Sequence, residues 1–288
     1  MADDSAYLHI PTHLNDVRRW LEQHLSPIAG SPQVETWHLL EALLAKPKHI
    51  ILNEIGSLTE AQRETLGKWL TRRLNREPLQ YITQTAYFYG LKLKVTQAVL
   101  IPRPETELMV ADALQHIRTL TAPTVVDVGT GSGAIALTIQ RECSQAQVTA
   151  SDVSEDALEL AHSNATSLGC DVSFIQSDLL AEVKLQHAVM QADVVLANLP
   201  YLPMSDQRWL TPEVLAEPSS ALFAGEDGLG LASRLEQQAF KLMKPSSLLY
   251  LELDPRNVQR AFEQSQAWAT KEILSDLATR QRFLKLTR

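Results

Sequence analysis

The sequence predicts an α/β protein in which a small helical domain precedes a doubly wound, mostly parallel β-sheet. Three observations predict this class. Apolar residues recur at helical spacing over the first 80 residues, alternation of period two follows near residue 87, and short apolar strands alternate with helices from about residue 105. At 288 residues, the chain is long enough for two domains.

The N-terminal part, residues 1–80, is expected to form four or five short helices. Leucines recur at helical spacing in 39–44 and again in 66–74, and Thr59 is placed to cap the helix that holds the second run. Four cations cluster at the end of that helix: Lys68, Arg72, Arg73 and Arg76. We interpret this cluster as a solvated helix end, with a binding patch as the alternative, because cations suit the negative end of the helix dipole.

Residues 81–104 are expected to form a hairpin linker, since a turn glycine, Gly90, is followed by alternating apolar and polar residues. Residues 105–288 are expected to hold the sheet. Its strands are predicted at 124–128, 148–152, 172–175, 193–198, 247–253, 271–274 and 283–287, with helices at 133–142, 155–168 and 229–243. Ligands bind such sheets beyond the carboxyl ends of the strands, so the residues directly after each strand are the site candidates.

Composition and charge exclude several classes of function. Hydrophobic residues make up 45% of the chain, as in folded proteins, and the net charge is −8, which disfavours a stable nucleic-acid partner. Residues 81–288 carry 17 basic and 24 acidic groups, whereas residues 1–80 carry 9 and 10. No membrane span, signal peptide or metal-ligand spacing is visible. We therefore expect a cytoplasmic, monomeric protein without a metal or a membrane partner.

The first predicted strand ends in a glycine-rich turn, Asp127-Val-Gly-Thr-Gly-Ser-Gly-Ala134. Gly129, Gly131 and Gly133 allow a tight turn that closely approaches a ligand, and the following helix offers free N–H groups there. Asp152 ends the second strand, where its carboxylate could accept both ribose hydroxyls of a nucleoside. These features fit either a nicotinamide dinucleotide or S-adenosylmethionine.

Two further carboxylates favour S-adenosylmethionine. Asp127 lies inside the turn, where it would repel a pyrophosphate but attract the ammonium group of S-adenosylmethionine. Asp178 ends the third strand, where it could accept from an adenine amino group, although a capping role is the alternative.

The fourth strand ends in Asn198-Leu-Pro-Tyr201, a pattern suited to methylation of a planar nitrogen. Such a nitrogen is a poor nucleophile because its lone pair is delocalised, so both of its N–H bonds need acceptors. The Asn198 side-chain oxygen and the Leu199 backbone carbonyl can supply them. Pro200 fixes the backbone, and Tyr201 offers a flat face to a planar amide or base. An ordinary turn after a strand is the alternative interpretation.

Three segments together resemble the release-factor glutamine methyltransferase family (HemK/PrmC): Ile101-Pro-Arg-Pro-Glu-Thr-Glu107, the Asp127–Gly133 turn and Asn198–Tyr201. The resemblance covers nearly the whole chain, including Glu217-Pro-Ser-Ser-Ala-Leu222 and Gly225-Glu-Asp-Gly-Leu229. It implies a Rossmann-like class I S-adenosylmethionine-dependent methyltransferase sheet. It also implies methyl transfer to the side-chain amide nitrogen (N5) of the glutamine in the Gly-Gly-Gln motif of class 1 peptide-chain release factors.

The resemblance also assigns roles to residues. The cofactor-binding set is Asp127, Gly129, Thr130, Gly131, Ser132, Gly133, Asp152, Asp178, Leu179 and Asn198. Within this set, Asp127 and Asp178 are candidates from their chemistry. The substrate-binding set is Asn198, Leu199, Pro200, Tyr201, Arg103 and Glu105, of which Asn198, Pro200 and Tyr201 are the catalytic candidates. The segment from Arg103 to Glu107 would cover the site, and the N-terminal domain would dock the release factor.

The chain departs from the family pattern at three places: Leu199 replaces a proline, Glu252-Leu-Asp254 replaces Glu-Ile-Gly, and Thr279 replaces a glycine. Ribosomal-RNA adenine N6-dimethyltransferases also tend to carry Asn-Leu-Pro-Tyr, which makes RNA methylation the alternative function. A binding protein without turnover is a third interpretation. The acidic sheet domain, the Pro-Arg-Pro-Glu-Thr-Glu segment and the preceding helices favour the glutamine family, since an acidic surface would attract a basic protein and repel RNA.

Overall fold

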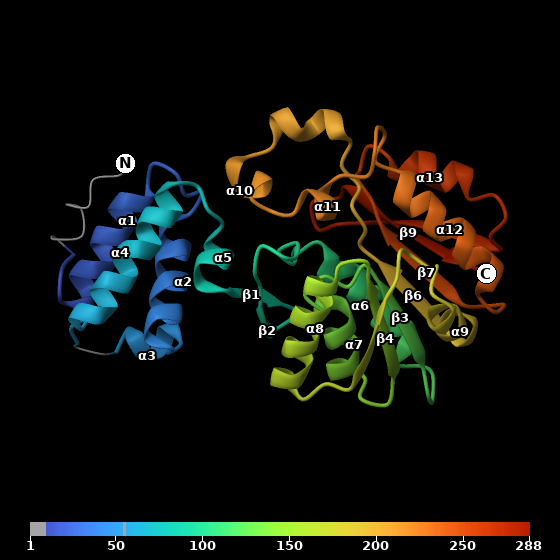
Figure 1. Cartoon of the computed structure of the whole chain (residues 1–288), viewed down its shortest axis with the longest axis horizontal. Coiled ribbons are helices and arrows are strands. Elements are labelled where there is room, and N and C mark those ends of the chain that lie inside the picture. Colours follow the sequence, from blue (N-terminus) through green and yellow to red (C-terminus); the bar gives the residue numbers. More distant parts are fainter. Residues whose placement is uncertain (1–9, 54–55) are drawn as a thin grey trace. The chain divides into compact units, whose positions relative to one another are not determined.

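The computed structural model describes residues 10–53 and 56–288, and the chain divides into two compact units (Figure 1). The first unit contains the described residues up to Thr85 together with a short segment, Thr211–Ala216. The second unit contains Ala86–Leu210 and Glu217–Arg288.

The first unit is helical, as the sequence predicts. Its N-terminal helices are α1 (Leu14–Leu25), α2 (Pro32–Leu44), α3 (Lys48–Ile51), α4 (Glu60–Leu74) and α5 (Leu79–Thr83). Thr59 caps α4 through a capping box, in which its hydroxyl accepts from the Gln62 backbone and the Gln62 side chain accepts from the Thr59 backbone. Leu21, Leu39 and Leu66 are fully buried where α1, α2 and α4 meet, so the leucine spacing in the sequence marks the core of this unit.

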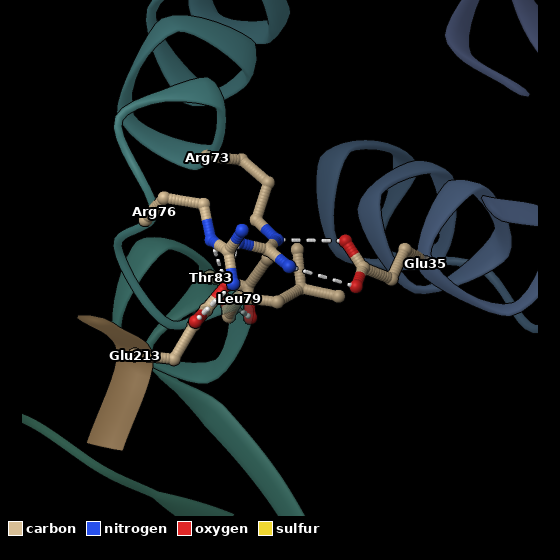
Figure 2. A network of polar contacts seen from close by, with 6 residues as sticks. All are labelled: Glu35, Arg73, Arg76, Leu79, Thr83 and Glu213. Atoms are coloured by element: carbon tan, nitrogen blue, oxygen red, sulfur yellow. Dashed lines mark hydrogen bonds and ion pairs between the residues drawn. The ribbon is translucent and has the colours of Figure 1, made fainter. Parts of the chain in front are cut away.

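Arg73, near the end of α4, is buried, so the interpretation of the basic cluster as a solvated helix end is wrong at this residue. Its guanidinium is bidentate to Glu35 on α2, at 2.7 and 3.0 Å, and also donates to Glu213 at 2.9 Å (Figure 2). Arg76 donates to both Glu213 oxygens, at 2.6 and 2.8 Å. The helix dipole is a local argument, and it could not anticipate two carboxylates brought in from distant parts of the chain.

Glu213 lies on α10 (Pro212–Leu215) (Figure 2). This helix is part of the segment Thr211–Ala216, which belongs to the first unit although the residues before and after it in the sequence belong to the second. Burial opposes ionisation of Glu213, but the hydrogen bonds from Arg76 and Arg73 outweigh it and lower its pKa to about 2. Lys68 and Arg72 fit the original interpretation better, since they pair at the surface with Glu64 and Glu77.

The predicted hairpin is confirmed, with strands β1 (Thr85–Phe88) and β2 (Leu91–Lys94). Tyr89 and Gly90 form its turn, both with left-handed φ angles, of 49° and 77°. Phe88, Leu91 and Leu93 belong to the core of the second unit. The apolar residues that alternate in the sequence are therefore the ones whose side chains pack into this core.

A seven-stranded sheet forms the centre of the second unit, in the order β5-β4-β3-β6-β7-β9-β8. The strands are β3 (Thr124–Val128), β4 (Gln147–Asp152), β5 (Val172–Gln176), β6 (Val194–Ala197), β7 (Leu248–Glu252), β8 (Thr270–Ser275) and β9 (Gln281–Thr287). Strands β3 to β7 pair in parallel, and β9 is antiparallel to both of its neighbours. All seven predicted strands are confirmed. The chain order reverses between β3 and β6, which is where sheets of this kind bind ligands.

Two layers of helices cover the sheet (Figure 1). One layer comprises α6 (Thr106–Ile117), α7 (Ala134–Glu142) and α8 (Glu155–Leu168), and the other comprises α9 (Val183–Gln191), α12 (Gly230–Leu242) and α13 (Val258–Gln264). Alternate residues of β6 enter the two cores, Val194 on one side and Val195 on the other. The central strands β6 and β7 are therefore buried on both faces, which explains their almost continuous apolar sequence.

The loop that follows β6 is the longest excursion from the sheet. It carries η2 (Met204–Trp209), α10 and α11 (Ser219–Leu222), and its two ends pair at Leu202 and Phe223. This loop therefore leaves the sheet directly after Asn198–Tyr201 and supplies α10 to the first unit.

Candidate functional site

A cavity lies at the carboxyl ends of β3 to β6 in the second unit. Most of the residues predicted from the sequence line it: Arg103, Gly129, Thr130, Gly131, Ser132, Asp152, Asp178, Leu179, Asn198, Leu199 and Pro200. The fold thus brings together the ends of four strands, as expected for a doubly wound sheet. Asp127, Gly133, Glu105 and Tyr201 are not among the residues that line this cavity.

The glycine turn is held by hydrogen bonds to β4. The N–H groups of Gly129 and Thr130 donate to the Ser151 carbonyl at 2.8 and 2.9 Å, and Gly131 N–H donates to the Asp152 carboxylate at 2.9 Å. Gly129 has a φ of +78°, and a Cβ there would lie 2.8 Å from Leu199 Cδ2. Leu199, the departure from the family pattern, therefore packs directly on the turn.

Asp152 and Asp178 present carboxylates at the cavity with different surroundings. Asp152 accepts from Gly131 N–H and from Ser154 N–H at 3.0 Å, and each oxygen keeps lone pairs for a further donor. Asp178 is half-exposed and accepts from Arg234 at 3.0 Å. Leu179, next in the chain, is buried and has a φ of 52°, so its backbone makes a sharp turn at the cavity wall.

Asp127 is fully buried behind the turn rather than at the cavity wall. One carboxylate oxygen accepts from the Thr130 hydroxyl at 2.6 Å and from Ala136 N–H at 3.3 Å, and the other has no hydrogen-bond partner. Burial raises the pKa of Asp127 to about 7 despite these two hydrogen bonds, and the negative charge of Asp152 adds to the rise. The Asp127 side chain thus ties the turn to the start of α7.

The Asp127→Asn variant is expected to gain stability as the pH rises, relative to the natural protein. Because the folded-state pKa of Asp127 lies above its ordinary value, its contribution to stability is present at low pH and is lost as the pH rises to about 7. Urea unfolding near pH 5 and near pH 8 should show the variant gaining more than about 1 kcal/mol between the two, since one pKa unit corresponds to about 1.4 kcal/mol. An equal difference at both pH values would contradict this account.

Asn198 lines the cavity, and only the nitrogen end of its carboxamide is hydrogen-bonded. Its Nδ2 donates to the Thr106 hydroxyl at 3.0 Å, whereas its buried Oδ1 has no hydrogen-bond partner. Thr106 in turn donates to the buried carboxylate of Glu252 at 2.7 Å. An unpaired buried acceptor is costly unless a ligand satisfies it, so Asn198 is poised to accept from an N–H of a bound molecule.

Tyr201, the last residue of the Asn198–Tyr201 motif, does not line the cavity. Its hydroxyl is 3.5 Å from Glu252, and burial raises the pKa of the phenol. Gly228 approaches the Tyr201 backbone so closely that a Cβ would lie 2.2 Å from the Tyr201 carbonyl oxygen. The Gly225–Leu229 loop therefore supports the backbone of the motif, and only glycine fits there.

The segment before α6 is fixed by Glu217. Arg103 donates to this buried carboxylate at 2.5 Å, and the Ile101 N–H donates to its other oxygen at 3.0 Å. The resemblance implies that the segment from Arg103 to Glu107 covers the site, but the sequence does not identify Thr106 or Glu217 as residues whose side chains support it. Both residues lie in motifs that carry the family resemblance, Ile101–Glu107 and Glu217–Leu222. A motif does not show, however, which of its side chains form hydrogen bonds with distant residues.

In the described part of the chain, no group of three or more Asp, Glu, His or Cys residues could hold a metal ion. Within the same residues, every helix is too short or too polar to cross a membrane.

Comparisons with known proteins agree with this geometry. Residues 106–227 match the family model of the methyltransferase small domain, and residues 16–83 match that of the PrmC N-terminal domain. The release factor glutamine methyltransferase of Deinococcus radiodurans is 39% identical over 265 residues, which span 90% of this chain and 92% of that protein. The chain belongs to the release factor glutamine methyltransferase family.

Other family members extend the similarity. The release factor glutamine methyltransferase of Streptomyces coelicolor is 38% identical over 220 residues, covering 74% of this chain and 77% of that protein. Among solved structures, the catalytic domain of hMettl16 in complex with MAT2A 3′UTR hairpin 6 shares the fold, with a TM-score of 0.54 at 14% identity over 79% of this chain and 81% of that one. The protein is thus a methyltransferase, and the family expected from the sequence is confirmed against the adenine-methylating alternative.

Proposed function

We propose that this methyltransferase transfers the methyl group of S-adenosylmethionine to the side-chain amide nitrogen of the glutamine in the Gly-Gly-Gln motif of class 1 release factors. The observation that carries the proposal is the free, buried Oδ1 of Asn198. It is one of the two acceptors that a primary amide needs, and the Leu199 carbonyl one residue later supplies the second.

The chemistry requires positioning more than a strong base. An amide nitrogen donates its lone pair to its own carbonyl, so it attacks only when both N–H bonds are held and the lone pair faces the methyl group. Asn198 and Leu199 would hold the two N–H bonds, and Pro200 restricts the backbone between them and Tyr201. Most of the acceleration would then come from orientation.

The residues around the cavity suit S-adenosylmethionine, which supplies an electrophilic methyl group on a sulfonium. The backbone from Gly129 to Ser132 lines the cavity and would approach the bound cofactor closely, and Asp152 could accept from its ribose hydroxyls. Asp178 and Leu179 also line the cavity and would recognise the adenine. Asp127 would act through the turn rather than by direct contact with the ammonium group.

The protein substrate would be recruited by charge and by the helical unit. Residues 81–288 hold most of the net negative charge, which favours a basic protein over RNA. The first unit would dock the release factor, and the enzyme would act as a cytoplasmic monomer. Turnover should accordingly weaken as ionic strength rises.

The test incubates the enzyme and labelled S-adenosylmethionine with a class 1 release factor, in parallel with a factor whose Gly-Gly-Gln glutamine is replaced by alanine. Label should enter only the natural factor, and mass spectrometry should place one methyl group on that glutamine. Equal labelling of both factors would refute the proposed target.

A further inference from the structure

The buried hydrogen-bond chain behind Asn198 has a direction, and that direction decides which end of the Asn198 carboxamide faces the cavity. The oxygen and nitrogen of a carboxamide are nearly equal in size, so packing alone does not distinguish the two orientations. If Nδ2 faced the cavity, it would meet the N–H groups of a substrate amide, and two donors cannot bond to each other. A directional partner is therefore needed on the buried side.

Thr106 and Glu252 supply that direction. An ionised carboxylate can only accept, so the Thr106 hydroxyl must donate to Glu252 across their 2.7 Å contact. Only lone pairs of Thr106 then remain for Asn198, which must offer Nδ2, as it does at 3.0 Å. Thr106 and Glu252 are 3% and 2% exposed, so water does not substitute for either partner.

We propose that Glu252, acting through the Thr106 hydroxyl, is a positioning residue that turns the Asn198 oxygen toward the substrate amide. This inference rests on the proposed function, because it assigns the presented oxygen to the N–H groups of a glutamine side chain. Rotation of the carboxamide would break the Thr106 contact or reverse the whole chain, so ionised Glu252 holds one orientation.

The proposal predicts a dependence on pH, because a protonated Glu252 could donate to Thr106 and would no longer fix the direction. The charged and titratable groups that face Glu252 are Glu105 before α6, Arg282 on β9 and Tyr201 in the loop after β6. Burial raises the pKa of Glu252 to about 7, although the Thr106 hydrogen bond and the positive charge of Arg282 oppose the rise. Methyl transfer should therefore increase as the pH rises through about 7.

The first arm of the test measures the kcat and KM for a release factor from about pH 6 to about pH 8. Thr106→Val keeps the side-chain shape but removes the hydroxyl, and it should lower kcat about tenfold to a hundredfold with little change in KM. Thr106→Ser keeps the hydroxyl and should restore most of the rate. Glu252→Gln should lose the acidic limb of the profile, which separates Glu252 from Asp127, whose pKa lies in the same range.

The second arm needs no substrate. In ¹⁵N-labelled enzyme, the side-chain amide signals of Asn198, assigned with Asn198→Ala, should shift with a midpoint near pH 7. The shift should persist in Thr106→Ser and vanish in Thr106→Val and Glu252→Gln. If it persists in both of the latter variants, or if Thr106→Val keeps the natural kcat, the proposal is wrong. Failure of the natural enzyme to methylate a release factor would instead overturn the proposed function, and the amide titration would still test the role of Glu252.

Discussion

Replacing Asn198 with alanine is expected to lower the kcat of methyl transfer by about 10²- to 10³-fold and to leave cofactor binding largely intact. The size follows from the loss of one preorganised hydrogen-bonding group at a reacting centre. The residue accepts through Oδ1 and is anchored to Thr106 through Nδ2, so alanine removes both the acceptor and its anchor. Single-turnover methylation and calorimetric titration with S-adenosylmethionine would measure the two effects separately.

Two variants sharpen this prediction. Asn198→Asp keeps acceptor oxygens at the cavity and should retain more activity than the alanine variant. Gln259→Ala removes an exposed amide on α13, away from the cavity, where its side chain donates to Glu263, and should have no effect. Full activity of Asn198→Ala would refute the requirement for two acceptors. If Asn198→Ala lowered the affinity for S-adenosylmethionine by as large a factor as it lowered kcat, the loss of activity would be due to weaker cofactor binding.

Replacing Arg73 with alanine is expected to lower the free energy of unfolding by about 3–5 kcal/mol, the range observed when one partner of a buried ion pair is removed. Arg73 is 4% exposed and holds Glu35 and Glu213 together, so its loss leaves Glu35 without this cation, whereas Glu213 keeps only Arg76. Urea unfolding would measure the change. Release of α10 should also speed tryptic cleavage after Arg208, which is exposed five residues before Glu213.

Arg72→Ala provides the matched control, since Arg72 belongs to the same helix but pairs with Glu77 at the surface, where an ion pair contributes at most about 1 kcal/mol. Acid should reduce the effect of Arg73→Ala. The pKa of Glu213 is lowered to about 2, so its contribution is present above its ordinary value of 4.5 and is lost as the pH falls through about 2. Equal destabilisation by the two variants would show that the Arg73 network does not stabilise the fold.

Sequence and structure agree best where local periodicity decides the outcome. The strands were predicted to within about two residues, because a strand buried on both faces is a short apolar run that ends where polar residues begin. The capped start of α4 at Thr59 and the hairpin turn at Gly90 are equally local. Small elements with little apolar periodicity, such as α10 and α11, were not predicted.

The same logic located the cavity but not its supporting contacts. Parallel strands end at one edge of the sheet, so residues placed directly after strands had to converge, and Asn198, Asp152 and the glycine turn do. Asp127 is the instructive exception. The sequence predicts that its carboxylate attracts the ammonium group of the cofactor, whereas the structure buries the side chain against Thr130 and Ala136.

The sequence by itself determined the fold class, the family and the main wall of the cavity, because each depends on local spacing or on contiguous motifs. Only the tertiary structure decided how those residues are held. Thr106 and Asn198 are 92 positions apart, Thr106 and Glu252 are 146 apart, and Arg73 and Glu213 are 140 apart. Hydrogen bonds and ion pairs between residues so far apart in the sequence depend on which side chains the fold brings into contact. The local pattern of a single sequence does not specify these contacts.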